Sequence, residues 1–186
     1  MTVSVVIPTY LRPKELMRAI ASVRAQTYPV EWLVIPDETP REEYPTDPQA
    51  FWCAKGCNPR NDGLDRATGE WVMSLDDDDT LEPGAVAALV AAGEANDWDV
   101  VYGRSNVAGV GLLGSWPPRA SGFVNGSVLW RASFGYRFDP ECWRRGLPAD
   151  WDLWSRMLAD GRRWGFIPDV VHHYYPSGPM PKCDPS

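Results

Sequence analysis

The sequence predicts a single α/β domain whose central, mostly parallel sheet is flanked by helices. The chain has 186 residues, the usual size of one domain, and 44% of them are hydrophobic, which is enough for a packed core. Short apolar runs alternate with segments of helical periodicity in the first half of the chain. That alternation is typical of parallel sheets whose strands are joined by helices.

The first elements follow from local composition. Residues 3–7 form a β-branched run ended by a proline, which predicts a strand, and residues 14–26 carry apolar side chains at helical spacing. Residues 32–35 predict a second strand. The stretch Glu38 to Pro59 is rich in proline, charge and aromatic residues, so we expect a long irregular excursion there.

Regular elements resume after this excursion. Residues 61–68 predict a helix closed by a glycine, and residues 70–75 predict a strand. A helix is expected over residues 83–96, which begin with a proline in the first turn, and a short strand over residues 99–102.

The last third is less regular. The Gly- and Pro-rich stretch Gly103 to Gly122 predicts a mobile loop. A strand over residues 123–130 and a helix over residues 150–159 follow. Two late strands are expected at residues 164–167 and 170–174.

Four consecutive aspartates, Asp76–Asp79, directly follow the third major strand. Carboxylates this close together resist ionising at the same time, so they must face solvent or a cation. Oxygen-rich clusters suit Mg²⁺ or Mn²⁺, which proteins commonly share with substrate phosphates. A solvated acidic turn before a helix is the alternative interpretation, because aspartate is favoured at helix N-termini.

Polar residues follow three of the predicted strands. Pro8, Thr9 and Tyr10 come after the first strand, Asp37 after the second, and the aspartate run after the third. Ligands of open α/β sheets bind beyond the carboxyl ends of the strands. This convergence favours a metal-bridged phosphate site over a solvated turn.

Charge is unevenly distributed along the chain. The net charge of −7 combines −13 in residues 31–99 with +3 on each side of that segment. The basic residues form no dense stripe, so the sequence has no strong nucleic-acid signature. No apolar run approaches the length of a membrane span, about 18 to 20 residues, and we expect a cytoplasmic protein.

The four cysteines are expected to be free thiols. Cys53 and Cys57 are close in sequence, whereas Cys142 and Cys183 stand apart. One Cys-x-x-x-Cys pair without a second matched pair or a histidine pair is a weak zinc signal.

Several motifs, in order, resemble those of the family 2 glycosyltransferases of GT-A fold, which is a Rossmann-like α/β fold. The resemblance covers nearly the whole chain. It is carried by Val5–Tyr10, Ala25–Pro29, Asn61–Leu64, Ala67–Glu70, Leu75–Asp79, Phe138–Asp139 and Ala149–Trp154.

The resemblance implies one glycosyltransferase domain over residues 1–186. Residues 1–103 would bind a nucleotide sugar, and residues 104–186 would hold the acceptor and the catalytic base. The implied reaction moves a sugar from a nucleotide diphosphate sugar, most commonly a UDP-sugar, to an acceptor hydroxyl with inversion. Glycans, proteins and other small or polymeric molecules remain open as acceptors.

The resemblance also assigns residues to the donor and to a divalent metal, Mn²⁺ or Mg²⁺. Asp78 would bind the metal, Asp79 would help the metal or the donor sugar, and His172 or His173 would complete the site. Asp77, at the variable position of the motif, is expected to be solvated. The nucleotide would be held by Pro8, Thr9, Tyr10, Asp37, Arg60, Asn61 and Asp76.

Asp150 is the expected catalytic base. An acceptor hydroxyl needs a base for in-line displacement, and general-base catalysis contributes about 10² to 10⁴-fold. Asp152 is the rival, but two residues further along a helix its side chain points elsewhere. Ala149 stands where the family usually has glutamate, so the resemblance does not define the acceptor.

Two tryptophans are candidate platforms for the acceptor. Trp116 lies in the Gly- and Pro-rich loop, which could close over the donor, and Trp151 is next to the proposed base. A structural role in the core is the alternative for most tryptophans in this chain.

Two other functions remain open from the sequence. A nucleotidyltransferase has a similar nucleotide-binding half and an acidic metal site, but it does not predict the motif around Asp150. A catalytically inactive module that binds a nucleotide sugar or a divalent metal is the non-enzymatic alternative.

Overall fold

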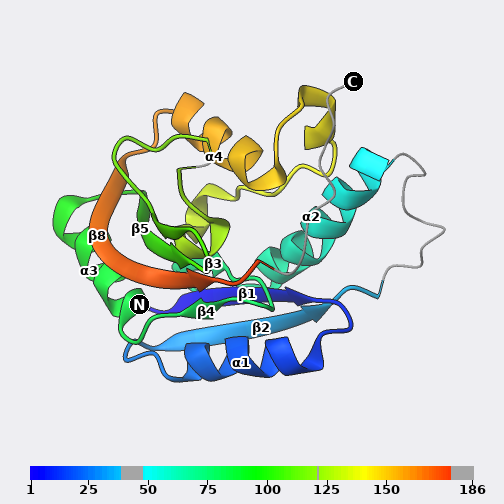
Figure 1. Cartoon of the computed structure of the whole chain (residues 1–186). Helices are drawn as coiled ribbons and strands as arrows, with labels where there is room; N and C mark the ends of the chain where they lie inside the picture. The colour runs from blue at the N-terminus through cyan, green and yellow to red at the C-terminus, as the bar shows by residue number, and fades with distance from the viewer. Residues whose placement is uncertain (39–47, 121, 177–186) are drawn as a thin grey trace.

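A mixed eight-stranded sheet forms the centre of the protein in a computed structural model, which describes residues 1–38, 48–120 and 122–176 (Figure 1). The strand order is β2-β1-β3-β7-β5-β8-β4, and β6 pairs with β5. The strands are β1 (Val3–Thr9), β2 (Val30–Pro36), β3 (Trp71–Ser74), β4 (Thr80–Leu81), β5 (Val100–Val107), β6 (Gly111–Leu113), β7 (Val128–Arg131) and β8 (Trp164–Tyr174).

Helices lie on both sides of this sheet. Figure 1 shows α1 beneath β2, with α2 and α4 on the opposite side. The helices are α1 (Pro13–Arg24), α2 (Pro48–Arg66), α3 (Ala85–Asn96) and α4 (Ala149–Ala159), and the 3₁₀ helices are η2 (Asn125–Ser127), η3 (Ala132–Phe134) and η4 (Cys142–Arg145). The predicted α/β fold is confirmed.

The direction of the strands determines which residues meet at one edge. Strand β1 runs parallel to β2 and β3, so the residues that follow all three strands lie at the same edge. Strand β8 runs parallel to β5 and antiparallel to β4. Of the seven pairings, three are parallel and four antiparallel, so the sheet is more mixed than the sequence suggested.

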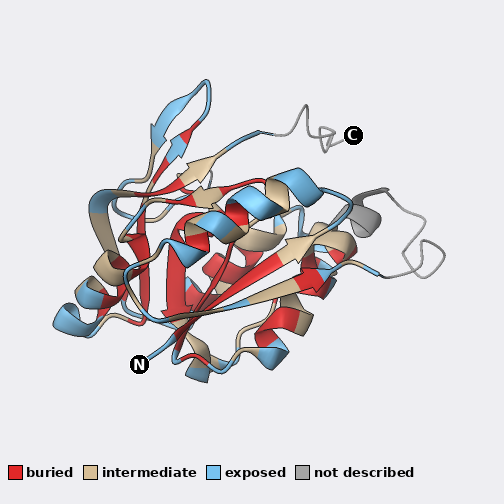
Figure 2. Cartoon of the chain, turned by 90° about the horizontal axis from the view of Figure 1, so that it is seen from below, coloured by how far each residue is buried: buried red, intermediate tan, exposed pale blue. Residues whose placement is uncertain are grey.

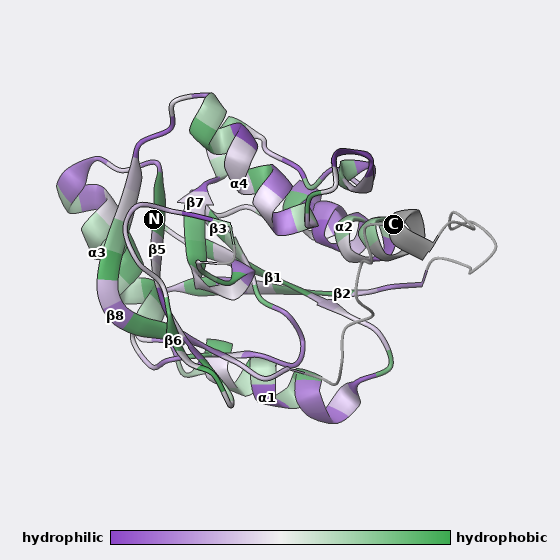
Figure 3. Ribbon diagram, turned by 45° about the horizontal axis from the view of Figure 1, so that its top comes forward, coloured by the Kyte–Doolittle hydropathy of each residue, from purple (hydrophilic) through white to green (hydrophobic). Residues whose placement is uncertain are grey.

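The core lies along β1, β3, β5 and β7, whose residues are mostly buried, and the buried residues in Figure 2 follow the centre of the sheet. Apolar residues follow the same strands, whereas hydrophilic residues lie on the outer faces of the helices (Figure 3). Trp71, Trp130 and Trp154 are among the largest fully buried side chains. Most of the free energy of folding is expected from this apolar burial.

Two expectations about irregular segments were wrong. The second half of the stretch Glu38 to Pro59 is helical, because α2 begins at Pro48 and runs through Pro59; residues 39–47 lie outside the described part. Burial of Ala54, Cys57 and Leu64 against the core stabilises this helix despite its internal proline, and tertiary packing outweighs local propensity there.

The stretch Gly103 to Gly122 is also partly regular. Strand β5 continues to Val107 and forms a hairpin with β6, while residue 121 lies outside the described part. Gly109 and Gly111 have φ angles of 78° and 107°, so the glycines that suggested a loop make the tight turn of the hairpin.

The two late strands are one strand, β8. Its register against β5 shifts between Tyr102 and Arg104, so residues 167–169 bulge and the strand then continues to Tyr174. Proline is tolerated at such bulges because no ladder hydrogen bond is required of it. This continuity carries the end of β8 to the aspartate run.

As expected, no disulfide joins the described cysteines Cys53, Cys57 and Cys142. Cys183 lies outside the described part. The hydrogen bond with Cys57 and, after it, burial raise the pKa of the Cys142 thiol, so this thiol stays protonated at neutral pH.

Candidate active site

The aspartate run forms the turn between β3 and β4. The amide of Asp79 donates to the carbonyl of Asp76 (3.1 Å), which closes the turn. The four side chains point to different partners, and these come from different elements of the fold. Each carboxylate therefore has a different environment.

Asp76 pairs with Arg60 of α2. The same guanidinium donates through Nε to Ser74 Oγ at 3.2 Å, so Arg60 is held against the end of β3. This arrangement joins two residues that the sequence assigned to nucleotide binding. It also leaves the Asp76 side chain about one third exposed.

Asp77 is buried, so the expectation of a solvated side chain was wrong. Only 5% of it is exposed, and its Oδ2 accepts a hydrogen bond from Thr9 Oγ1 at 2.7 Å. Burial raises the pKa of Asp77, while the Thr9 hydrogen bond and the charge of Arg12 act in the opposite direction. Asp77 therefore ties the aspartate turn to the end of β1.

Asp78 is bound by two arginines near α1. Its Oδ2 accepts from Arg12 Nη1 at 2.6 Å, and its backbone carbonyl accepts from Arg18. The Arg18 guanidinium also lies over the Tyr175 ring, 4.2 Å from its centroid. Positive charge at the start of α1 and within it thus compensates part of the negative charge of the turn.

Asp79 and His172 form a buried pair. His172 Nε2 lies 3.1 Å from Asp79 Oδ2, and His172 Nδ1 lies 3.1 Å from Ser105 Oγ on the neighbouring strand β5. The other Asp79 oxygen accepts from the amide of Tyr175 at 3.0 Å. Burial raises the pKa of Asp79, although the hydrogen bond from His172 lowers it.

Gly126 makes room for the His172 ring. A Cβ atom at this position would lie 2.4 Å from His172 Nε2, closer than van der Waals contact permits. His173, in contrast, pairs with Glu82 and does not join the aspartates. Adjacent residues of β8 face opposite ways, so only one of the two histidines reaches the cluster.

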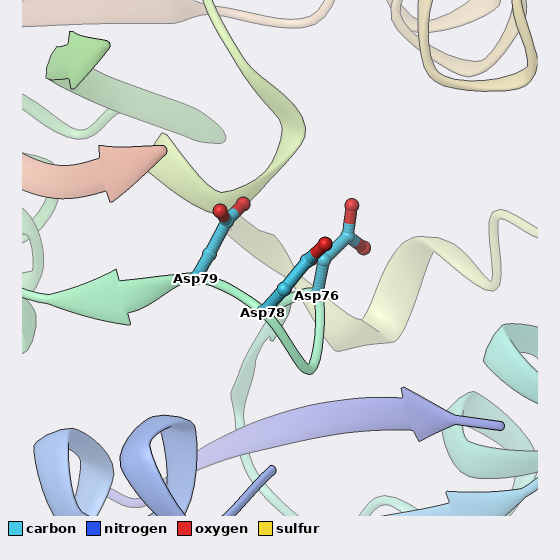
Figure 4. A group of neighbouring side chains, drawn as sticks. All are labelled: Asp76, Asp78 and Asp79. Carbon is cyan, nitrogen blue, oxygen red and sulfur yellow. The ribbon is translucent and has the colours of Figure 1, made fainter. Parts of the chain in front are cut away.

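Three carboxylates offer a chemically suitable metal site. Asp76, Asp78 and Asp79 each provide one oxygen, and these oxygens lie within 4.8 Å of one another (Figure 4). An all-oxygen, anionic donor set fits Mg²⁺ or Mn²⁺. The residues present therefore fit the expected divalent ion.

Asp150 lies at the first turn of α4, where its Oδ1 accepts from the Trp151 amide at 2.8 Å. Burial raises the pKa of Asp150, and the negative charge of Asp76 adds to this rise, whereas the Trp151 amide and Arg60 lower it. Asp150 therefore interacts electrostatically with both Arg60 and Asp76.

Asp152, the rival base, is engaged elsewhere. It is buried, and its two oxygens accept from Arg145 Nε at 2.8 Å and Arg156 Nε at 3.0 Å. Both carboxylate oxygens of Asp152 are therefore engaged by guanidiniums of this chain.

Two of the predicted nucleotide-binding residues, Asp37 and Asn61, lie in different surroundings. Asp37 lines a cavity of about 510 Å³ at the end of β2, together with Glu38, Asn58 and Asp62. Asn61 is instead bound on both sides to the Phe138 backbone, through Nδ2 to the carbonyl and Oδ1 from the amide (both 2.8 Å). Both polar ends of the Asn61 side chain are therefore engaged by the Phe138 backbone.

The segment after β1 borders the aspartate turn. Pro8 is the penultimate residue of β1, and the Tyr10 amide approaches Asp77 Oδ2 at 3.4 Å. The Tyr10 ring is half exposed and lies under Lys55 Nζ, 3.6 Å from the ring centroid. An exposed aromatic ring here can stack on a flat ligand.

The two candidate acceptor tryptophans differ. Trp116 follows β6 and is 57% exposed. Trp151 is partly buried and packs against the core, with its ring centroid 6.2 Å from that of Phe123. Trp116 is therefore the more accessible of the two.

Sequence reasoning missed four residues that surround the cluster: Arg12, Arg18, Ser105 and Asn125. Arg12 and Arg18 carry one available signal, because both cations closely follow the first strand's motif in an otherwise acidic half. Ser105 and Asn125 carry no local signal. Their positions depend on strand pairing between residues far apart in the chain.

The chain matches the model of the family described as glycosyl transferase family 2 over residues 57–155, more than half of its length. The site and fold define a sugar-transferase domain, and the chain belongs to glycosyl transferase family 2. Within the described residues, no helix has the length and apolar character needed to cross a membrane.

One curated relative and several solved structures are similar to this chain. The relative is the GalNAc(5)-diNAcBac-PP-undecaprenol beta-1,3-glucosyltransferase of Campylobacter jejuni, 31% identical over 101 residues, covering 47% of this chain and 33% of that protein. The chain thus spans about a third of that relative.

Two solved structures share the fold at low identity. S. aureus TarS 1-349 in complex with UDP-GlcNAc has a TM-score of 0.74 at 17% identity, over 97% of this chain and 60% of that chain. The mannosyltransferase PcManGT from Pyrobaculum calidifontis, in complex with GDP-Man and Mn²⁺, has a TM-score of 0.63 at 14% identity, over 97% and 58%. These likenesses confirm the glycosyltransferase fold.

Proposed function

We propose that this domain transfers a sugar from a nucleotide diphosphate sugar to an acceptor hydroxyl with inversion. The observation that carries the proposal is the cluster of Asp76, Asp78 and Asp79, in which Asp76 pairs with Arg60, together with the charge interactions of Arg60 and Asp76 with Asp150. One part of this arrangement suits a diphosphate with its counter-ion, and the other suits proton abstraction. Both are required for the reaction.

The binding roles follow from chemistry. The cavity beside Asp37 would hold the nucleobase of the donor, and the Asp76, Asp78 and Asp79 oxygens would hold Mn²⁺ or Mg²⁺. A divalent cation at that position supplies positive charge to the departing diphosphate without a proton transfer. Arg60 adds a fixed cation at the same edge of the sheet.

Asp150 would act as the base. A partly buried carboxylate with a raised pKa accepts a proton more readily than an ordinary exposed aspartate. The acceptor hydroxyl would lose its proton to Asp150 as its oxygen attacks the anomeric carbon, and the sugar–phosphate bond would break on the opposite face. That geometry gives inversion.

The donor is proposed to be a UDP-sugar, with a GDP-sugar as the second candidate. TarS binds UDP-GlcNAc and PcManGT binds GDP-Man, so relatives of this fold use both bases. The acceptor is proposed to be a hydroxyl on a glycan, since the similar Campylobacter protein is named as a glucosyltransferase acting on a lipid-linked saccharide.

The test compares two aspartates on α4. Release of UDP or GDP from UDP-glucose, UDP-GlcNAc and GDP-mannose is measured with Mn²⁺, together with donor binding by calorimetry. Asp150→Asn is expected to lower turnover at least 100-fold and to leave donor affinity within about twofold. Asp152→Asn is the matched control, expected to lower stability but to retain turnover in the folded fraction.

Two outcomes would reject the proposal. Unchanged turnover in Asp150→Asn would remove the assigned base, and donor affinity that is equal with and without Mn²⁺ would remove the metal site. Nucleotide sugar binding without any turnover in the wild type would instead support an inactive binding module. Transfer of a nucleotidyl group would support a nucleotidyltransferase.

A further inference from the structure

Asn125 has a buried acceptor oxygen that no described residue satisfies. The side chain is 6% exposed, and Oδ1 has no hydrogen-bond partner within the described part of the chain. Its Nδ2 donates to the Ser74 carbonyl at 3.4 Å. Because a carbonyl accepts and never donates, this contact determines which end of the amide faces Ser74 and which end is left unpaired.

The free-energy cost of an unpaired buried oxygen suggests that Asn125 has a functional role. A buried polar atom without a partner destabilises a protein, and native structures contain few of them. Among the described residues, two other buried atoms have no hydrogen-bond partner, the indole nitrogens of Trp154 and Trp164. These two rings pack against each other, with an interplanar angle of 87° and centroids 6.0 Å apart. Asn125 lies outside such a cluster.

Asn125 and Gly126 contact residues that are linked to the first and the last aspartate of the turn, Asp76 and Asp79. Ser74, its partner, also binds Arg60, which pairs with Asp76. The next residue, Gly126, packs directly against His172, the partner of Asp79. Asn125 is therefore connected to Asp76 through Ser74 and Arg60, and its neighbour Gly126 is connected to Asp79 through His172.

The strand order gives the direction of a bound donor. The cavity beside Asp37 lies at β2, the aspartates follow β3, and Asn125 precedes β7, the neighbour of β3 on the other side. A nucleotide diphosphate sugar with its base at β2 and its diphosphate at the aspartates would continue toward β7. Its sugar would then reach Asn125.

We propose that Asn125 Oδ1 accepts a hydrogen bond from a hydroxyl of the transferred sugar, so that Asn125 helps to select the donor. An unpaired acceptor oxygen repels phosphate oxygens but matches a hydroxyl group, which can donate. The inference rests on the proposed function, because it requires a nucleotide sugar at this edge of the sheet. It adds a residue that recognises the sugar and not the nucleotide.

The experiment measures recognition of the sugar separately from recognition of the nucleotide. Dissociation constants for UDP, GDP, UDP-glucose, UDP-GlcNAc and GDP-mannose are measured with Mn²⁺ by calorimetry, in the wild type and in Asn125→Leu, which keeps the size of the side chain but removes the acceptor. The ratio of the Kd of the best donor to that of its free nucleotide is expected to rise about 3- to 10-fold. The Kd of the free nucleotide is expected to stay within twofold.

The controls keep the result interpretable. Asn96→Ala removes another amide whose Nδ2 donates to a backbone carbonyl, that of Ala92 at 2.9 Å, but on α3, and it is expected to change neither constant. Thermal unfolding checks that Asn125→Leu folds, and Asn125→Ala replaces it if it does not, with the same expected ratio.

An unchanged ratio, or an equal loss for nucleotide and nucleotide sugar, would overturn the role of Asn125 while leaving the proposed function in place. A wild type that binds no nucleotide sugar would overturn both.

Discussion

Arg12 Nη1 lies 2.6 Å from Oδ2 of Asp78, one of the three carboxylates placed to hold a metal ion. The same nitrogen lies 3.3 Å from Asp77 Oδ1. Without a metal, this guanidinium compensates part of the negative charge of the turn. A divalent ion entering the site meets both a repulsive charge and an oxygen already engaged.

Arg12→Gln is therefore expected to tighten Mn²⁺ binding in the absence of nucleotide, by about 3- to 10-fold. The magnitude is modest because the Arg12 side chain is 44% exposed and solvent screens its charge. Calorimetric titration with Mn²⁺ measures the effect. Arg24→Gln, at the other end of α1, is the matched control, and weaker Mn²⁺ binding in Arg12→Gln would mean that Arg12 orients Asp78 for the metal.

The contact between Gly126 and His172 gives a second prediction. Gly126→Ala places a Cβ atom 2.4 Å from His172 Nε2, so the ring must move and its hydrogen bond to Asp79 is lost. We expect a loss of stability of about 1 to 3 kcal/mol, typical of overpacking, together with weaker Mn²⁺ binding. Urea unfolding and Mn²⁺ titration measure the two effects.

Gly63→Ala is the control for this prediction. Its Cβ atom would lie 2.3 Å from Val6 Cγ1, in the apolar core between α2 and β1. Overpacking is as severe there, but the aspartate turn is not touched. If both variants lose stability and neither loses Mn²⁺ affinity, His172 does not orient Asp79 for the metal.

The environment of Asp150 predicts the pH dependence of turnover. The base must be ionised, and burial raises its pKa above that of an ordinary aspartate, about 3.9. Turnover is therefore expected to fall as the pH drops through the raised pKa, at a higher pH than exposed aspartates would give. The pH profile of kcat/KM is measured with Mn²⁺ saturating at every pH, and a profile that is flat down to pH ~4 would contradict the assignment.

An ion pair far from the site gives a prediction about stability. Asp99 Oδ2 accepts from the Arg163 amide at 2.9 Å, and Oδ1 accepts from Arg163 Nη2 at 2.7 Å. These hydrogen bonds hold the pKa of Asp99 below its usual value, although burial acts in the opposite direction. Asp99→Asn is expected to lower the free energy of unfolding by about 1 to 2 kcal/mol at pH 7.

The sign of the pH effect follows from this lowered pKa. The stabilisation is fully present above the unfolded-state pKa of about 3.9, and it is lost as the pH falls through the lower folded-state value. The wild type and Asp99→Asn should therefore converge in stability in acid. Urea unfolding at pH 7 and near pH 3 tests this, with the exposed Asp169→Asn expected to change stability by less than about 0.5 kcal/mol.

Local patterns predicted the elements that pack by their own periodicity. Strand β1 and helices α1, α3 and α4 were expected within a few residues of their observed bounds. The first half of α2 could not be predicted, because its composition is that of a loop and burial against the sheet stabilises it. The hairpin of β5 and β6 was missed because its glycines suit a turn as well as a loop.

The aspartate run itself was predictable as a site, but the partners of its members were not. Asp77 is buried by Thr9, which lies 68 positions away in the sequence, and Asp79 by His172, 93 positions away. Such contacts depend on the order of strands in the sheet. The roles of the predicted site residues remain predictions.

The four carboxylates of the turn are bound by α2, by the end of β1, by the start of α1 and by β8. A metal ion that draws three of them together must therefore pull on elements from the beginning, middle and end of the chain at once. Occupancy of the site should consequently slow amide hydrogen exchange in strands that never touch the ligand. Amide hydrogen exchange in these distant strands would then show whether the metal site is occupied.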